Sequence, residues 1–348
     1  MKKLFISIFT VIMIFSCNKD ESSEAEVLDF SVTSVSDSEL EIGSIQIDSE
    51  FNRIYILFDQ DLSEFSSFSL TIDINLSPGA KTSSLNNGML SFTNSDEVKT
   101  IEVEAEDGFM VRWYVYLIHH QIQNSGFENW FDNLGMNGRY YKEIGTSDVT
   151  SIWATANMGT SIYAVYGTQP LDDGSNTLAE ITTDSTSQVP VTAGALFVGT
   201  FNLSGAISHP TDPKQATDFG LPYTFRPSEM KVKFKYQAGE TYVQATLNET
   251  NNIFGGFTVN EIEGEDMCSI YTILEVRNGD QITEIGRAEL YSETTDDVLT
   301  EITIPFEYTS TETPTHISVV FSSSKDGDLW KGAVGSTLVV DDLELIFE

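Results

Sequence analysis

The residues of this 348-residue sequence that are best suited to chemistry are aromatic side chains in or beside expected loops, with polar side chains near them. Flat aromatic rings bind the C–H faces of sugars, and amide, carboxylate and guanidinium groups bind sugar hydroxyls. The candidates for a carbohydrate-binding surface are Trp153, Trp330, Trp130, Tyr223, Asn157, Arg226 and Asp328. The alternative is structural, because an aromatic residue beside a loop commonly covers the end of a sandwich, and an arginine among many acids forms ion pairs.

Catalytic chemistry has weak support in the sequence. A glycosidase needs two carboxyl groups at a fixed separation, one of them with a raised pKa. With 53 acidic residues, chance pairs are abundant; Glu128, Asp266 and Asp341 come first among the candidates, and none is assigned a catalytic role. The histidines have no zinc-ligand spacing, and the sequence has no Gly-x-Ser-x-Gly, phosphate-loop or dinucleotide motif.

The charge balance limits the possible partners. The 18 basic and 53 acidic residues give a net charge of −35, which argues against nucleic acid and anionic lipid surfaces and suits a solvated extracellular protein. Cys268 lies in a strand-like pattern, where a buried apolar cysteine is expected rather than a nucleophile.

Residues 1–17 have the pattern of a targeting segment. Lys2 and Lys3 precede an apolar run that is too short to span a bilayer, and the run ends at Cys17. This end resembles a bacterial lipobox, which implies acylation of Cys17, and residues 18–21 resemble the signal that sends Bacteroidetes lipoproteins to the outer face of the outer membrane. A cleaved signal peptide without a lipid is the alternative. Residues 18–26 are expected to form a flexible tether.

The rest of the chain predicts an all-β protein with two sandwiches. In residues 27–120, about seven short strands separated by turn residues predict an immunoglobulin-like sandwich. Residues 121–348 predict a larger antiparallel jelly-roll sandwich with long loops. Within it, Lys231–Tyr236 alternates strictly, so three lysines face outward, either as an anion-binding stripe or as solvent-facing charges that protect the strand from unwanted pairing and balance the acids nearby.

The C-terminal region contains six stretches that together resemble a known family: 126–130, 152–157, 193–199, 220–227, 266–271 and 335–343. The family that they resemble is the putative carbohydrate metabolism domain of Bacteroidetes lipoproteins. The resemblance implies a jelly roll that is related in shape to carbohydrate-binding modules, on a surface lipoprotein that serves glycan recognition or uptake together with glycan-uptake proteins. The alternatives are a glycoside hydrolase with a carboxylate pair, and a structural or adhesion protein of the cell surface.

A structural Ca²⁺ also follows from this resemblance. Many carbohydrate-binding jelly rolls hold one Ca²⁺ with acidic residues near both ends of the domain, positions that Glu128, Asp341 and Asp342 match here. A two-residue period places Asp341 on the same face as Val339 and Leu343, where a carboxylate is costly unless it is paired or metal-bound. The alternatives are a capped or solvated Asp341, or an inward Asp342 if a bulge intervenes.

Overall fold

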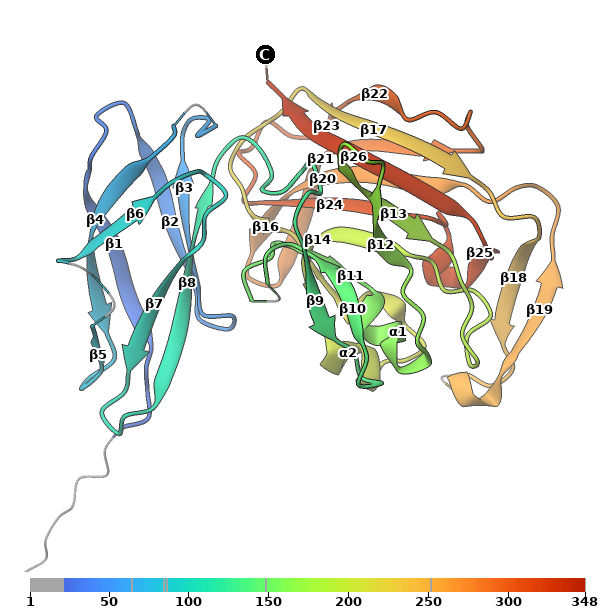
Figure 1. Cartoon of the computed structure of the whole chain (residues 1–348), viewed down its shortest axis with the longest axis horizontal. Coiled ribbons are helices and arrows are strands. Elements are labelled where there is room, and N and C mark those ends of the chain that lie inside the picture. The colour runs from blue at the N-terminus through green and yellow to red at the C-terminus, as the bar shows by residue number, and fades with distance from the viewer. Residues whose placement is uncertain are drawn as a thin grey trace, which may run out of the picture.

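The structure is a computed structural model that describes residues 22–63, 65–83, 85, 87–147, 149–250 and 252–347. Nearly all of its regular structure is β-sheet, arranged as two sandwiches that follow one another along the chain (Figure 1). The prediction of an all-β fold is therefore confirmed. No helix in the described part is long and apolar enough to cross a membrane. Cys17 lies outside the described residues, so its acylation stays a prediction.

The N-terminal sandwich consists of two sheets. The first sheet has the order β1-β4-β6, and its strands are β1 (Val27–Val35), β4 (Phe68–Leu76) and β6 (Met89–Phe92). The second sheet has the order β2-β3-β8-β7-β5, and its strands are β2 (Ile42–Asp48), β3 (Arg53–Phe58), β8 (Met110–Ile118), β7 (Lys99–Glu104) and β5 (Lys81–Thr82). β3 and β8 run parallel. Apolar side chains from both sheets fill the space between them, with Trp113 fully buried.

The C-terminal sandwich has an eight-stranded and a five-stranded sheet. The larger sheet contains β11 (Trp153–Thr155), β14 (Ala195–Phe201), β24 (His316–Ser322), β20 (Cys268–Asn278), β21 (Gln281–Ser292) and β23 (Glu307–Tyr308), with β15 (Thr217–Phe219) beside β14 and β16 (Leu221–Pro222) beside β24. The smaller sheet contains β12 (Thr168–Asp172), β13 (Thr177–Thr182), β26 (Thr337–Ile346), β17 (Glu229–Gln237) and β22 (Thr300–Pro305).

Two small sheets and several short helices complete this sandwich. The sheets are the hairpin of β9 (Trp130–Leu134) and β10 (Tyr140–Ile144), and the three strands β19 (Phe257–Glu261), β18 (Tyr242–Leu247) and β25 (Lys331–Ala333). The helices are α1 (Asn157–Thr160), η1 (Ser161–Tyr163), α2 (Leu203–Ser208), η2 (Pro213–Ala216), η3 (Ile253–Gly255) and η4 (Gly327–Leu329). In Figure 1, β18 and β19 lie at the end of the C-terminal sandwich that is farthest from the N-terminal sandwich.

The alternation predicted for Lys231–Tyr236 is confirmed in β17, where Val232, Phe234 and Tyr236 are buried and the lysines between them are partly exposed. Each of these lysines pairs with a carboxylate: Lys231 with Glu344, Lys233 with Asp342 and Lys235 with Asp297. The lysines therefore balance neighbouring acids, as the second of the two interpretations expects.

The two sandwiches share part of their core. Tyr55 and Tyr116 of the N-terminal sandwich belong to the same buried cluster as the residues between the sheets of the C-terminal sandwich. The Tyr116 hydroxyl donates a 2.9 Å hydrogen bond to the Val149 carbonyl, and the Tyr223 hydroxyl donates a 2.7 Å bond to the His120 carbonyl. The junction is thus a packed interface rather than a free linker.

Candidate functional site

Trp330 and Asp328, two of the predicted carbohydrate-binding residues, line the same cleft. The cleft has a volume of about 630 Å³, which is within the range of small-ligand sites. Its walls come from β18, from η4 with the residue after it, and from the segment 211–214 that leads into η2. The two predicted residues meet side chains here from parts of the chain that are distant in sequence.

Trp330 has an unusual backbone conformation. Its φ of 53° and ψ of 40° are left-handed, a region that large residues rarely adopt and that is enriched at functional sites. Two hydrogen bonds hold it there, from its own N–H to the Gly327 carbonyl at 3.0 Å and from the Ala245 N–H to its carbonyl at 2.9 Å. The indole packs edge-to-face against Phe257, with 5.1 Å between the ring centroids. The backbone and Phe257 thus fix the ring at the edge of the cleft.

Polar groups surround Trp330 in the cleft. The Asp328 carboxylate forms an ion pair with Lys214, with 2.7 Å between Oδ2 and Nζ, and this pair joins η4 to η2. Gln244 donates to the carbonyls of Leu329 and Ala245, at 2.9 and 3.0 Å, so that its amide is held in place. An indole with a carboxylate, an ammonium and an amide beside it is the combination that binds the C–H face and the hydroxyls of a sugar.

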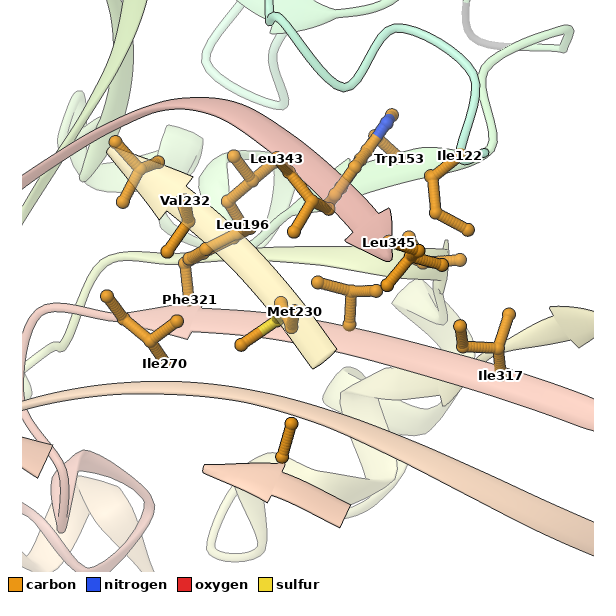
Figure 2. Packing of buried hydrophobic residues seen from close by; sticks show 14 of the residues in the cluster. Ile122, Trp153, Leu196, Met230, Val232, Ile270, Ile317, Phe321, Leu343 and Leu345 are labelled. Carbon is orange, nitrogen blue, oxygen red and sulfur yellow. The ribbon is translucent and has the colours of Figure 1, made fainter. Parts of the chain in front are cut away.

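The structure places Trp153 in the core and not at a surface. Trp153 is 2 % exposed. Its ring packs edge-to-face against Phe127 and is stacked on Phe321. The indole N–H donates a 2.7 Å bond to the Gln123 carbonyl. Figure 2 shows Trp153 among the buried residues, next to Ile122. The prediction that Trp153 contacts a glycan is therefore wrong, because no part of the ring is available to a ligand outside the core.

Tyr223 and Asn157 are also structural. Tyr223 has no exposed surface and binds His120 as described above. Asn157 is 1 % exposed; its Nδ2 donates to the carbonyls of Thr168 at 2.6 Å and Lys142 at 3.4 Å, and its Oδ1 accepts a 3.1 Å bond from the Thr168 N–H. Neither residue can belong to a glycan-binding surface, so these two predictions are corrected as well.

Arg226 and Trp130 are likewise occupied by the protein itself. The Arg226 guanidinium donates to the carbonyls of Ser310 and Glu312 and lies 4.0 Å above the Tyr308 ring. Arg226 therefore has a structural role, but through main-chain carbonyls and a ring and not through the ion pair that the alternative interpretation expects. Trp130 is half-buried at the start of β9, and its indole N–H donates a 2.6 Å bond to the Phe127 carbonyl. Trp130 packs against the core cluster and lies apart from the Trp330 cleft.

Asp341 does not lie on the face that the two-residue period predicts. The pairing of β17 with β26 shifts between Lys231 and Lys233, and Asp342 has a φ of 46°, so β26 contains a bulge at this point. Because of the bulge, Asp341 shares its side of the sheet with its cross-strand partner Lys233, opposite the core residues Leu343 and Leu345. The prediction that Asp341 and Leu343 share a face is wrong, and Asp342 is exposed rather than inward.

Asp341 is nevertheless buried, at 2 % exposure, on that outer side. Its Oδ2 accepts a 2.7 Å bond from the Asn176 amide, and its Oδ1 has no hydrogen-bond partner. Burial, with the negative charges of Asp342 and Glu128 adding to it, raises the pKa of Asp341 to about 6. Asp342 is paired with Lys233 at 2.6 Å, and Glu128 accepts a 3.3 Å bond from the Thr177 N–H. Within the described residues, no three His, Cys, Asp or Glu side chains are grouped so as to hold an ion.

Asp266, a candidate for catalysis, is a buried structural acceptor. Its Oδ2 accepts bonds from the Ser324 hydroxyl at 2.5 Å, the Ala333 N–H at 2.8 Å and the Ser336 hydroxyl at 2.7 Å. Its Oδ1 accepts a 2.9 Å bond from the Met267 N–H. Burial raises the pKa of Asp266, and these bonds oppose the rise. Asp266 thus joins segments on both sides of the Trp330 turn, is 1 % exposed, and lines neither the Trp330 cleft nor the cleft between the two sandwiches.

Sequence reasoning missed Lys214 and Gln244 as members of the Trp330 cleft. Both occur in ordinary sequence contexts, and only the pairing of β18 with β25 brings Gln244 opposite Lys331 and next to the turn.

The sequence analysis also missed Glu143, a residue that is 8 % exposed and accepts a 3.0 Å hydrogen bond from the Thr155 hydroxyl. Burial raises the pKa of Glu143 to about 7. The alternation of β10 gave a signal for a buried position there, since Tyr141 and Glu143 share a face.

Comparison with known proteins gives a family and a fold. Residues 126–346 match the model of the family described as "Putative carbohydrate metabolism domain". A solved structure of a putative glycoside hydrolase from Bacteroides thetaiotaomicron is 24% identical, with a TM-score of 0.55, over 95% of this chain and 99% of that one. A putative glycoside hydrolase from Bacteroides vulgatus is also 24% identical, with a TM-score of 0.51, over 64% of this chain and 97% of that one. None of the curated proteins matches the chain. The two solved structures show a shared fold.

Proposed function

The chain belongs to the family of the putative carbohydrate metabolism domain, and from this premise we propose that it binds carbohydrate in the cleft around Trp330. The observation that carries the proposal is the fixed, left-handed Trp330 at the edge of a cleft of about 630 Å³, with Asp328, Lys214 and Gln244 beside it. A strained residue persists only where its surroundings hold it, and such residues concentrate at ligand sites.

The cleft suits a sugar better than an apolar ligand. The indole and Leu329, which is 60% exposed, offer the apolar contact, and the Asp328–Lys214 pair offers an acceptor and donors for hydroxyl groups. The Gln244 amide is held by two carbonyls, so little side-chain entropy is lost when it contacts a ligand. Binding at such an open site is shallow, and aromatic contact gives most of the affinity.

The proposal places this domain on a lipoprotein at the outer face of the outer membrane, where glycan-uptake proteins are its partners. This part rests on the sequence pattern of residues 1–17, with Cys17 as the acylated residue, and on residues 18–21 after it. The high negative charge of the chain supports a solvated surface position.

The proposal also includes one structural Ca²⁺ at Asp341. The unpartnered, buried Oδ1 of Asp341 supports it, because a hard cation there would satisfy that atom and offset the nearby charges of Glu128 and Asp342. Asp341 and Glu128 would be the carboxylate ligands, and main-chain or amide oxygens would have to complete the shell. The ion would stabilise the fold, with no part in a reaction.

The test is a glycan array, followed by calorimetry on any glycan bound, with the whole chain purified in detergent. Trp330→Ala should weaken binding by about tenfold or more, since a well-packed aromatic anchor is worth at least 1–2 kcal/mol. Tyr140→Ala is the matched control, because Tyr140 is an aromatic residue that is 71% exposed and lies outside the cleft. Binding that Trp330→Ala leaves unchanged would refute the site.

Glycoside hydrolysis is the second candidate, favoured by the fact that two carboxylates, Asp212 and Asp328, line the same cleft. Binding ranks ahead of it because Asp328 is engaged as an anion with Lys214, whereas a catalytic acid must carry a proton. Mass spectrometry of the glycan after incubation separates the two candidates: intact sugar supports binding, and fragments that disappear in Asp212→Asn and Asp328→Asn support hydrolysis. No binding to any glycan would favour an adhesion or structural role.

A further inference from the structure

A second cleft lies between the two sandwiches. It has a volume of about 480 Å³ and is lined on one side by residues 46–49, Phe51, Arg53 and Tyr55, which lie in β2, in β3 and in the turn between them. On the other side it is lined by Thr200, residues 218–220, Pro222, Arg277 and His316. Junctions between domains are common places for ligand sites, because two surfaces of different origin meet there.

The walls of this interdomain cleft are held in a fixed relation. The core cluster that includes Tyr55 and Tyr116 continues into the C-terminal sandwich. The Gln121 side chain donates a 2.8 Å bond to the Leu345 carbonyl and accepts a 2.9 Å bond from the Leu345 N–H. A cleft with walls joined in this way is preformed, so a ligand does not need to order it.

Arg53, at the start of β3, is the unusual group in this cleft. Its guanidinium lies 5.6 Å from the centre of the Phe51 ring and 5.5 Å from that of Tyr116. Among the described residues no carboxylate lies within 4.0 Å of it, although the chain has 53 acidic residues. Asp48 attracts it from a greater distance, but the Asp48 carboxylate accepts bonds from the N–H groups of Glu50 and Phe51.

A partly buried guanidinium without an anionic partner is costly, and the two aromatic rings offset only part of this cost. Arg277, across the cleft, differs from Arg53 in this respect. Its Nε and Nη2 donate to Glu275 at 2.8 and 2.7 Å, and Nη2 also donates to the Phe219 carbonyl. Arg277 is therefore already neutralised, and Arg53 is the cation of the cleft that is available for an anion.

The rest of the lining restricts which anion fits. Asp48 and Asp218 would repel a compact anion of high charge, such as phosphate, but both can accept hydroxyl donors. Thr200 and Gln46 add neutral polar groups. Phe51, a residue that is 39 % exposed, adds the face of an aromatic ring. His316 is neutral at pH 7, because burial and the charge of Arg277 lower its pKa to about 4.

We propose that the interdomain cleft binds an acidic sugar, a pyranose that carries a carboxylate, with Arg53 as the partner of that carboxylate. A guanidinium matches a carboxylate with two parallel hydrogen bonds, which is the contact that Arg53 lacks within the protein. The sugar hydroxyls donate to Asp48 and Asp218, and the C–H face of the ring lies against Phe51. The site is separate from the Trp330 cleft, which lies at the opposite end of the C-terminal sandwich, and the proposal does not depend on that cleft.

The test is calorimetry of the whole chain in detergent with oligogalacturonides and with neutral galacto-oligosaccharides of the same length. We expect the acidic sugars to bind more tightly, and to bind more weakly as the salt concentration rises. Arg53→Gln should weaken the acidic sugars by about ten- to a hundredfold, the value of a hydrogen-bonded charge pair, and leave the neutral sugars unchanged. Arg139→Gln is the matched control, because Arg139 is an exposed arginine outside both clefts.

Two further variants keep the test decisive if Arg53→Gln disturbs the junction. Ser49→Trp fills the cleft from an exposed turn position without removing a charge, and it should abolish binding of the acidic sugars. Trp330→Ala should leave their binding unchanged, so that failure of this site and of the Trp330 cleft can be told apart. Equal affinity for acidic and neutral sugars, no binding of acidic sugars, or full binding by both Arg53→Gln and Ser49→Trp would overturn the proposal.

Discussion

Replacing Asp266 should both destabilise the protein and disorder the Trp330 turn. The carboxylate accepts four hydrogen bonds, from Met267, Ser324, Ala333 and Ser336, of which Ser324 lies before the turn and Ala333 and Ser336 after it. In Asp266→Ala the Ala333 N–H, on a residue with no exposed surface, loses its acceptor. An unpaired buried donor costs about 1–3 kcal/mol, whereas the two hydroxyl groups can rotate to other acceptors at lower cost.

The total cost of Asp266→Ala should be about 2–4 kcal/mol, because relief from burying a charge offsets part of the lost bonds. In a domain of this size it corresponds to a fall in Tm of roughly 5–15 °C. Differential scanning calorimetry measures this directly. The same variant should lose affinity at the Trp330 cleft, since the turn loses the link between its two ends.

The isosteric variant Asp266→Asn separates hydrogen bonding from packing. Asparagine fills the same volume, and its carbonyl oxygen can still accept from Ser324, Ala333 and Ser336, but its NH₂ group then faces the Met267 N–H, where only an acceptor fits. We therefore expect Asp266→Asn to cost about 1 kcal/mol or more, and less than Asp266→Ala. Asp297→Ala is the control: this side chain is 93% exposed, and its loss should leave Tm unchanged. A wild-type Tm in Asp266→Asn would refute the reasoning, because the contribution would then come from packing alone.

Three further predictions follow from the same structure. In metal-free buffer, the stability of the wild type relative to Asp341→Asn should fall as pH rises from about 4 to above 6, because a folded-state pKa of about 6, above the ordinary value of 3.8, favours the protonated native state at low pH. Millimolar Ca²⁺ should remove this fall and EDTA should lower Tm, and the absence of any shift would contradict the metal proposal. Trp153→Ala should lower the free energy of unfolding by about 3–5 kcal/mol in urea titrations, as expected for a buried Trp, and an unchanged stability would contradict its place in the core. Cys17→Ala should release the protein from membranes in cell fractionation, and continued membrane association would contradict acylation as the anchor.

Local patterns in the sequence were sufficient for the strands with a marked apolar pattern, such as β17 and β8, but not for others, such as β2 and β13. The strict alternation in β17 and the apolar run in β8 set which side chains are buried, because in a strand successive side chains point to opposite faces. The same logic failed at Asp341, where one extra residue in β26 reverses the faces. A bulge depends on the pairing with β17, which the sequence of β26 alone does not contain.

Sequence determined the all-β class, and residue type beside a loop selected Trp330 and Asp328, which the structure places in one cleft. It could not separate Trp330 from Trp153, since both stand beside loops and only distant segments decide which ring is covered. Phe127 and Phe321 enclose Trp153, whereas the turn after η4 holds Trp330 at the edge of a cleft. Burial is a property of the whole packed chain and not of a local window.

Tertiary structure alone created the interdomain cleft. Arg53 in β3 and His316 in β24 are far apart in the sequence, and each occurs in an ordinary strand pattern. They meet because the core of one sandwich continues into the other and fixes how the two approach. Periodicity encodes which face of a strand is buried, whereas the neighbours of an exposed or half-buried side chain depend on long-range packing that no short stretch of sequence specifies.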